Sequence, residues 1–306
     1  MAETLWEKRG ALAEGLRAGA VAASRDGFGL VSAVAEPTAG ALQDRMRARR
    51  AHVYRATAQG LERVYEGPGW IQALEGHGPL CAALGATLKA SGSGSDYHLL
   101  VSTDGGRQWG VRGPVPAPSA VQVLAVSAQE LWVLGAYFLG RTLDGGATWE
   151  EVELEGERNP HAERLRRTEQ GPAVLGKGLM LTRDGGATWS RESAGGARLV
   201  DVDGAYVVAA EGLQARLGER RGGEVRWLSA LPVGREPLRL TVEGARVRVL
   251  TRNTDPSKGV EPTVHVSEDG GKTWSAQKHE LGAHVDIAGP HGLGMDLRGT
   301  VYGRLA

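Results

Sequence analysis

Ser102-Thr-Asp-Gly-Gly-Arg-Gln-Trp109 is the stretch that decides the fold, because the chain repeats it. The pattern S/T-x-D-x-G-x-x-W returns at Thr142–Trp149, Thr182–Trp189 and Ser267–Trp274. The first three copies start 40 residues apart, and the fourth starts 85 residues after the third. The longer gap is about two periods, and a worn copy, Gly222-Gly-Glu-Val-Arg-Trp227, lies within it. Such a period indicates a chain built from one repeated supersecondary unit.

The tryptophan of the motif marks the register of two further copies. Leu61 takes its place in Leu61-Glu-Arg-Val64, and Trp6, within Thr4–Arg9, ends a copy whose beginning is missing. The marks then fall at positions 6, 61, 109, 149, 189, 227 and 274. Because the gaps between them are similar, with the two chain ends counted as one gap, we predict seven repeats.

The sequence within one repeat is typical of short strands. Residues 121–154 contain four apolar or alternating runs separated by turn residues: Val121–Val126, Leu131–Gly135, Tyr137–Thr142 and Thr148–Leu154. Four-stranded sheets repeated radially make a β-propeller, which leaves only short, protected edges. The last repeat has three strands, and Glu3–Arg9 can supply its fourth. We therefore predict a single all-β domain, residues 1–306, that forms a seven-bladed β-propeller with four-stranded antiparallel blades and a last blade closed by the N-terminal strand.

Composition limits the possible functions. The 36 basic and 36 acidic residues balance, and 46 glycines without a three-residue period suit many tight turns. Cys81 is the only cysteine, so no intramolecular disulfide forms, and its apolar surroundings predict a buried side chain. No run of 18 apolar residues occurs, and the charged first residues do not suit a signal peptide. We expect a cytoplasmic monomer that needs no cofactor and binds neither nucleic acid nor membrane.

The repeated Asp-Gly-Gly segment has the chemistry of a hairpin turn. Glycine permits positive φ, and an aspartate before it accepts hydrogen bonds from the amides of the turn. The following tryptophan brings a large apolar area for packing between blades. We therefore assign structural roles, neither catalytic nor calcium-binding, to the box residues Asp104, Trp109, Asp144, Trp149, Asp184, Trp189, Asp269 and Trp274.

The motif resembles the Asp-box, or bacterial neuraminidase repeat. This repeat is found in sialidases, other glycoside hydrolases, sortilin-type receptors and the photosystem II stability/assembly factor. The resemblance implies a β-propeller in which each box forms the peripheral turn between the third and fourth strands of a blade. It does not imply one activity, because the same repeat serves enzymes, receptors and assembly factors.

A sialidase-like site, as the resemblance implies it, needs three arginines, a Tyr/Glu nucleophile pair and an acid near the ring axis. The chain has no Arg-Ile-Pro or Arg-Leu-Pro signature near its start, and Arg107, Arg141 and Arg183 fall at the peripheral boxes. Asp201 and Asp286 lie on expected inner strands, where solvated carboxylates are as reasonable as catalytic ones. We identify no catalytic residue, and a sialidase-like or other carbohydrate-active propeller remains the alternative.

Three histidines, His279, His284 and His291, lie close together in the sequence. The spacing of His279 and His284 places these two on one face of neither a helix nor a strand. We therefore expect no metal site.

The long insertions fall in connections that share one face of a propeller, which we predict as the binding face. They are Glu36–Arg50, Thr87–Asp96, Asn253–Glu261 and Glu155–His161. The first suits a short helix carrying Arg45, Arg47, Arg49 and Arg50, which either dock an acidic partner or a phosphate, or remain solvated without a partner. Lys89–Asp96 has the composition of a mobile linker. We predict a non-catalytic interaction or assembly scaffold that binds a protein partner through this face.

Overall fold

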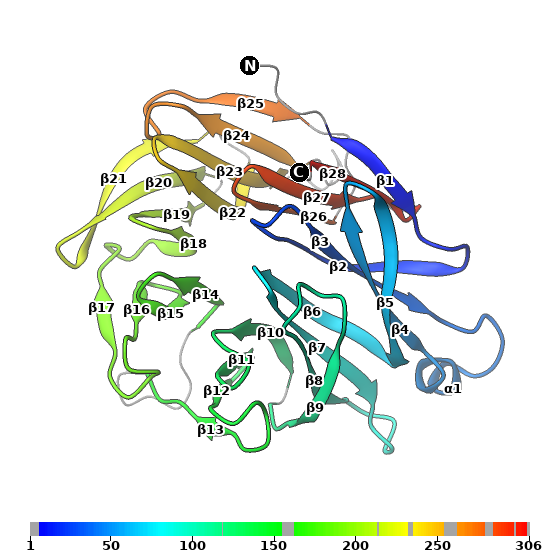
Figure 1. The fold of residues 1–306 in the computed structure, drawn as a ribbon. Helices are drawn as coiled ribbons and strands as arrows, with labels where there is room; N and C mark the ends of the chain where they lie inside the picture. The colour runs from blue at the N-terminus through cyan, green and yellow to red at the C-terminus, as the bar shows by residue number, and fades with distance from the viewer. Residues whose placement is uncertain are drawn as a thin grey trace. The chain divides into compact units, whose positions relative to one another are not determined.

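The computed structural model describes residues 6–117, 119–154, 162–212, 214–231, 235–253, 262–278, 284–296 and 298–304. They contain 28 strands and one six-residue helix, so the fold class is all-β (Figure 1). The chain has two compact units: unit 1 is residues 1–160 with 284–306, and unit 2 is residues 161–283. The described residues include no helix that is long and apolar enough to cross a membrane.

Unit 1 contains four antiparallel four-stranded sheets. Three are sequential and one joins the two ends of the chain. They are β2 (Leu16–Ala23), β3 (Gly29–Ala35), β4 (Arg50–Thr57) and β5 (Gly60–Pro68); β6 (Trp70–His77), β7 (Leu80–Leu88), β8 (Ser95–Ser102) and β9 (Gly110–Val115); β10 (Ala120–Ala125), β11 (Leu131–Gly135), β12 (Phe138–Thr142) and β13 (Glu150–Glu151); and β26 (His284–Ala288), β27 (His291–Met295), β28 (Thr300–Arg304) and β1 (Glu7–Ala11).

Unit 2 contains three further antiparallel four-stranded sheets, all sequential. They are β14 (Arg164–Thr168), β15 (Gly171–Leu175), β16 (Leu179–Leu181) and β17 (Ser190–Glu192); β18 (Arg198–Asp203), β19 (Tyr206–Glu211), β20 (Gln214–Arg221) and β21 (Glu224–Ala230); and β22 (Arg235–Glu243), β23 (Arg246–Asn253), β24 (Thr263–Ser267) and β25 (Ser275–Lys278).

These seven sheets are the blades of a seven-bladed β-propeller, as the repeats predicted. The N-terminal strand closes the last blade, because β1 pairs antiparallel with β28 and Glu7 lies opposite Gly303 (Figure 1). Trp6 packs closely against Gly292 of β27, where a Cβ atom would lie 2.5 Å from the indole ring. The prediction of a blade composed of both chain ends is therefore confirmed. Below, blades are numbered in chain order, so that β2–β5 form blade 1 and β6–β9 form blade 2.

The core lies between neighbouring sheets. One buried cluster joins blades 1 and 2 through residues such as Leu30 and Leu100, and Trp109 packs against it. Trp149 packs against the cluster between blades 2 and 3, and Trp274 against the cluster between blades 5 and 6. These contacts support a packing role for the box tryptophans, since a buried indole removes a large apolar area from water.

Four carboxylates on the first strands of three blades connect those blades to the next one. Glu75 accepts a hydrogen bond from the Ala125 amide at 2.8 Å, and Asp286 accepts one from Ala23 at 2.9 Å. Asp201 accepts a hydrogen bond from the Leu240 amide at 2.8 Å, and Asp203 accepts one from the Val242 amide at 2.7 Å. Asp201 is only 1% exposed, so the solvated carboxylate, one of the two roles that the sequence left open for it, is not what the structure shows. Because its oxygens bind amides of two strands, burial does not leave the charge without partners.

Candidate protein-binding site

The four Asp-boxes form turns between the third and fourth strands, and their carboxylates bind atoms of the same turn. In each box the first hydroxyl donates to the Asp Oδ1 atom at 2.7–2.8 Å and accepts from the amide of the second glycine at 2.6–2.9 Å. The same Oδ1 atom accepts a hydrogen bond from the backbone amide four residues after the aspartate. In the second box, for example, the Thr148 amide donates to Asp144 at 2.9 Å. Both glycines have positive φ, such as 74° and 98° at Gly145 and Gly146. This geometry supports a structural role for the four aspartates.

These hydrogen bonds also set the charge of the boxes. The Thr188 hydroxyl and amide lower the pKa of Asp184 to about 2, because both donors favour the ionised carboxylate. The pKa values of Asp144 and Asp269 lie well below the ordinary value for the same reason. In the worn copy, Gly222 and Gly223 form a two-residue hairpin between β20 and β21, which needs no carboxylate.

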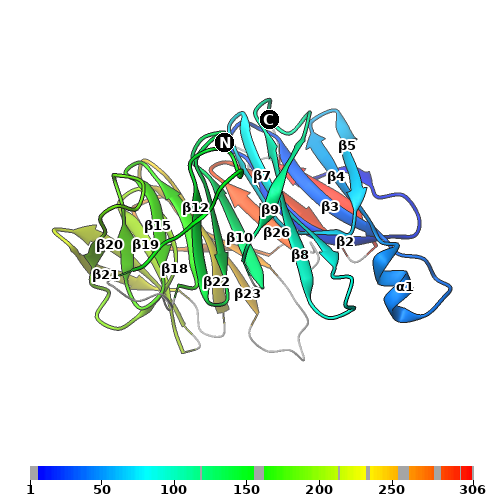
Figure 2. The same cartoon turned by 90° about the horizontal axis from the view of Figure 1, so that it is seen from below.

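The first insertion contains the predicted helix, α1 (Leu42–Arg47), beyond the ends of β3 and β4 (Figure 2). It has no buried residue and no side-chain N-cap. The four arginines of this insertion do not converge on one point. Arg45 and Arg49 face Glu36, at 3.9 and 2.8 Å. Arg47 donates to the Ala90 carbonyl at 3.0 Å, and Arg50 pairs with Glu66 at 3.2 Å.

A fifth arginine, absent from the sequence prediction, joins the pair at Glu36. Arg17 of β2 lies 3.4 Å from the same carboxylate, although 19 residues separate them in the chain. Three guanidinium groups therefore face one carboxylate, and the hydrogen bond from Arg49 holds the pKa of Glu36 below its usual range. Counting Arg17, Arg45 and Arg49 against Glu36 leaves a net charge of 3 − 1 = +2.

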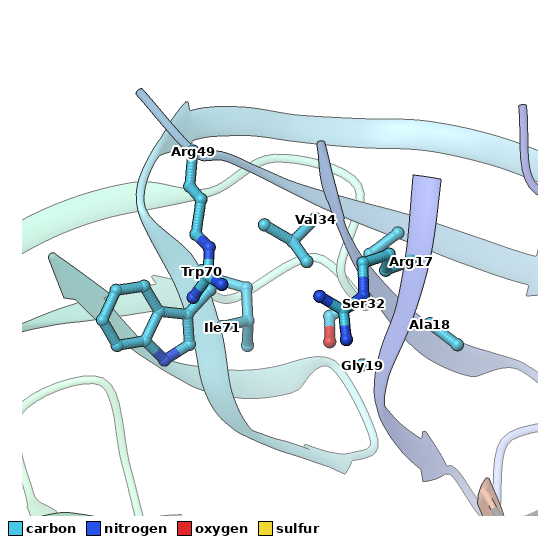
Figure 3. A pocket seen from close by; sticks show the side chains of 9 residues that line it. Arg17, Ala18, Gly19, Ser32, Val34, Arg49, Trp70 and Ile71 are labelled. Atoms are coloured by element: carbon cyan, nitrogen blue, oxygen red, sulfur yellow. The ribbon is translucent and has the colours of Figure 1, made fainter. Parts of the chain in front are cut away.

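A pocket of about 210 Å³ opens beside this charge cluster, between blades 1 and 2. Figure 3 shows the guanidinium groups of Arg17 and Arg49 inside it, with the indole of Trp70 along one side. Arg49 lies over the Trp70 ring, 5.6 Å from its centroid, which is within cation–π range. Val34 and Ile71 supply apolar walls. We call this the Arg17–Trp70 pocket.

Two glycines fix the shape of the Arg17–Trp70 pocket. The Gly69 amide donates to the Arg49 carbonyl at 2.8 Å, which ties the α1 insertion to the start of β6. Gly69 has a φ of 80°, and a Cβ there would lie 1.8 Å from the Ala86 carbonyl oxygen. At Gly19, a Cβ would lie 2.5 Å from the Ser32 hydroxyl, which bridges the β-bulge of β2 by bonding to Ala20. Neither position accommodates a side chain without movement.

The second insertion contacts the first. Its residues 89–94 form a turn with hydrogen bonds between Lys89 and Gly94 and between Gly92 and Lys89. Arg47 binds the Ala90 carbonyl, and Gly92 lies against Gln43 of α1. We call residues 36–49, 69–71 and 89–94, together with Arg17, the blade 1–2 loop face. The predicted mobility of Lys89–Asp96 stays a prediction, whereas its docking on α1 was not predicted.

The other two predicted insertions fall almost entirely outside the residues that the structure describes. Residues 155–161 and 254–261 of the predicted binding face lie outside the described residues, as does His279. His284 begins β26 and pairs with Met295, while His291 begins β27 and pairs with Ala288, so the two histidines lie at opposite ends of one hairpin. Within the described ranges, no group of three or more His, Cys, Asp or Glu side chains is arranged to hold a metal ion.

A second set of arginines occurs on the first strands of unit 2, which sequence reasoning also missed. Arg166 of β14 and Arg239 of β22 both pair with Asp201, the latter at 3.9 Å. Arg164 donates to the Leu238 carbonyl at 3.4 Å, and burial lowers its pKa to about 10. Converging arginines would suit a substrate carboxylate. Here the buried carboxylate of Asp201 takes that position.

Comparison with known proteins agrees with this architecture. The model of the BNR/Asp-box repeat matches residues 265–276. The structure of YCF48 bound to D1 peptide is similar at a TM-score of 0.61 and 15% identity, over 98% of this chain and 97% of that chain. The structure of YCF48 from Cyanidioschyzon merolae is similar at a TM-score of 0.59 and 14% identity, over 97% of this chain and 98% of that chain.

The solved structure of an enzyme is similar to this chain to a comparable degree. The GH74 xyloglucanase from Xanthomonas campestris gives a TM-score of 0.60 and 15% identity, over 98% of this chain and 53% of that chain. The search of curated proteins gives no match. At such identities the likeness to solved structures concerns the fold. The motif, the sheets and the comparisons together identify the chain as a seven-bladed β-propeller with BNR/Asp-box repeats.

Proposed function

We propose that this propeller is a non-catalytic interaction or assembly scaffold that binds a protein partner through the blade 1–2 loop face. The observation that carries the proposal is the Arg17–Trp70 pocket, where an excess of positive charge and an aromatic ring meet at inserted loops. Arginine and tryptophan are enriched among the residues that dominate protein interfaces. A cytoplasmic location and a monomeric state remain predictions from the sequence.

The similarity to YCF48 supports this proposal. That protein was solved with a D1 peptide bound, so a propeller with this arrangement of blades accommodates a peptide. The inner acids of the present chain also favour binding over hydrolysis. Asp201 and Asp286 accept main-chain amides of neighbouring blades, and a carboxylate used in this way is poorly placed to act as an acid or a nucleophile.

The alternative is a carbohydrate-active propeller, to which the GH74 likeness corresponds. Glycosidases use two carboxylates on either side of the scissile bond. Binding to a glycan array, or hydrolysis of xyloglucan that is lost on substitution of an acid in the first strand of a blade, would support this alternative and contradict the scaffold.

Affinity purification from the native host, read by mass spectrometry, tests the scaffold. The bait variants are the charge reversal Arg17→Glu/Arg45→Glu/Arg49→Glu and, as a matched control on unit 1, Arg112→Glu, whose exposed arginine lies on β9. We expect at least one protein to purify with the wild-type and control baits and to be lost from the triple variant. Equal recovery with all three folded baits would contradict the proposed face.

A further inference from the structure

The excess positive charge of the Arg17–Trp70 pocket is most accessible to a ligand at Arg17. Arg49 is 20% exposed and is held by Glu36 and the Trp70 ring. Arg17 is 71% exposed, and its 3.4 Å contact with Glu36 is a long one. Since one carboxylate cannot neutralise three guanidinium groups, an incoming anion would be attracted to Arg17 with little competition from Glu36.

The dimensions and lining of the pocket indicate the class of that anion. Its volume of about 210 Å³ is below the roughly 300–1,000 Å³ of usual small-molecule sites, so it suits one side chain rather than a sugar or a nucleotide. Val34, Ile71 and the indole of Trp70 would contact an aliphatic stem, while the planar fork of Arg17 suits a carboxylate. A phosphate would pair with the arginines but has no apolar part to contact these walls.

We propose that the Arg17–Trp70 pocket binds the side-chain carboxylate of an Asp or Glu residue in an extended segment of the protein partner. This rests on the proposed function and names the chemistry that the partner must present. Arg17 donates to the carboxylate, Arg49 adds positive charge from its fixed place over Trp70, and the stem of the acidic side chain packs on the indole. Leu42, 60% exposed on the neighbouring α1, offers an apolar contact to the flanking residues of the segment.

A phage library of random dodecamer peptides, selected on the full chain, tests this inference. We expect the selected peptides to share an Asp or Glu beside an apolar residue. A selected peptide labelled with fluorescein should bind Arg17→Gln at least about tenfold more weakly than wild type, because a charge-assisted hydrogen bond is lost. Arg112→Gln should bind like wild type, and binding should weaken as sodium chloride is added.

The alternatives give different results. Selected peptides without acidic residues, no selected peptide, or equal binding by a folded Arg17→Gln would overturn the pocket assignment. Displacement of the labelled peptide by inorganic phosphate, but not by glutamate at the same ionic strength, would instead assign the pocket to phosphate. The scaffold proposal is tested separately. A native partner that is lost from the triple charge reversal but retained by Arg17→Gln would support the blade 1–2 loop face as the interface and would contradict the assignment of the Arg17–Trp70 pocket.

Discussion

Acidification should destabilise the fold through one buried histidine, His265 of β24. Its side chain is 2% exposed, and its Nε2 atom lies 3.1 Å from the Thr251 hydroxyl. That hydroxyl also lies 3.4 Å from the Thr263 carbonyl oxygen, to which it can donate while it accepts a proton from Nε2. Among the described residues, Nδ1 is buried without a hydrogen-bond partner. A second proton on this ring would therefore be buried without an acceptor.

The magnitude follows from the shift in pKa. Burial, with a smaller effect of the Arg235 charge, lowers the pKa of His265 from 6.5 to about 4. Between these values the unfolded chain binds a proton that the folded chain excludes, so stability falls as the pH falls from about 6.5 to about 4. A pKa that is lower by roughly 2.5 in the folded state corresponds to a loss of at most about 3 kcal/mol in the free energy of unfolding.

Urea unfolding of the wild type and of His265→Gln between pH 7 and pH 4.5 measures this effect. The glutamine amide can still donate to Thr251 but does not titrate. We expect the wild type to lose about 2–3 kcal/mol more than the variant over this range. The contributions of other histidines are common to both proteins and cancel in the difference. Parallel losses of stability in the two proteins would refute the reasoning.

Three further substitutions or reactions test other parts of the structure. Gly69→Ala should destabilise the protein by more than about 1 kcal/mol relative to Gly15→Ala, which has a similar φ of 83° but no atom within 4 Å of its Cβ position; urea unfolding gives both values. Cys81 is fully buried, and burial raises its pKa to about 12, so it should react with a thiol reagent at pH 8 only after denaturation, as absorbance would record. Asp184→Ala should lower the thermal midpoint by removing the acceptor of its box turn, whereas an unchanged midpoint in calorimetry would contradict a structural role for the box.

The sequence predicted the repeat architecture well because the relevant signals are local. Each box places two glycines, a hydroxyl and a carboxylate within five residues, and together they form a turn without help from the rest of the chain. Leu61 and Trp6 could be placed because the period itself supplied their register. The closure by β1 followed from counting strands in the last repeat.

The proposed binding site was only partly predictable, because its charges come from separate segments. Arg45 and Arg49 belong to the predicted basic insertion, but Arg47 and Arg50 have other partners. Arg17 joins the site only when β2 lies beside this insertion, and no local pattern marks that contact. The burial of Asp201 was not predictable for the same reason, since its partners Leu240 and Arg166 lie on neighbouring blades.

Site-specific photo-crosslinking tests most directly whether the blade 1–2 loop face holds a protein partner. Leu42 on α1 is 60% exposed, and Val111 on β9 of the same unit is 61% exposed, so the two positions present a crosslinker equally well. With p-benzoylphenylalanine at either position in the native host, our account predicts one discrete crosslinked protein from position 42 and none from position 111. A discrete adduct from position 111 with none from position 42 would contradict it.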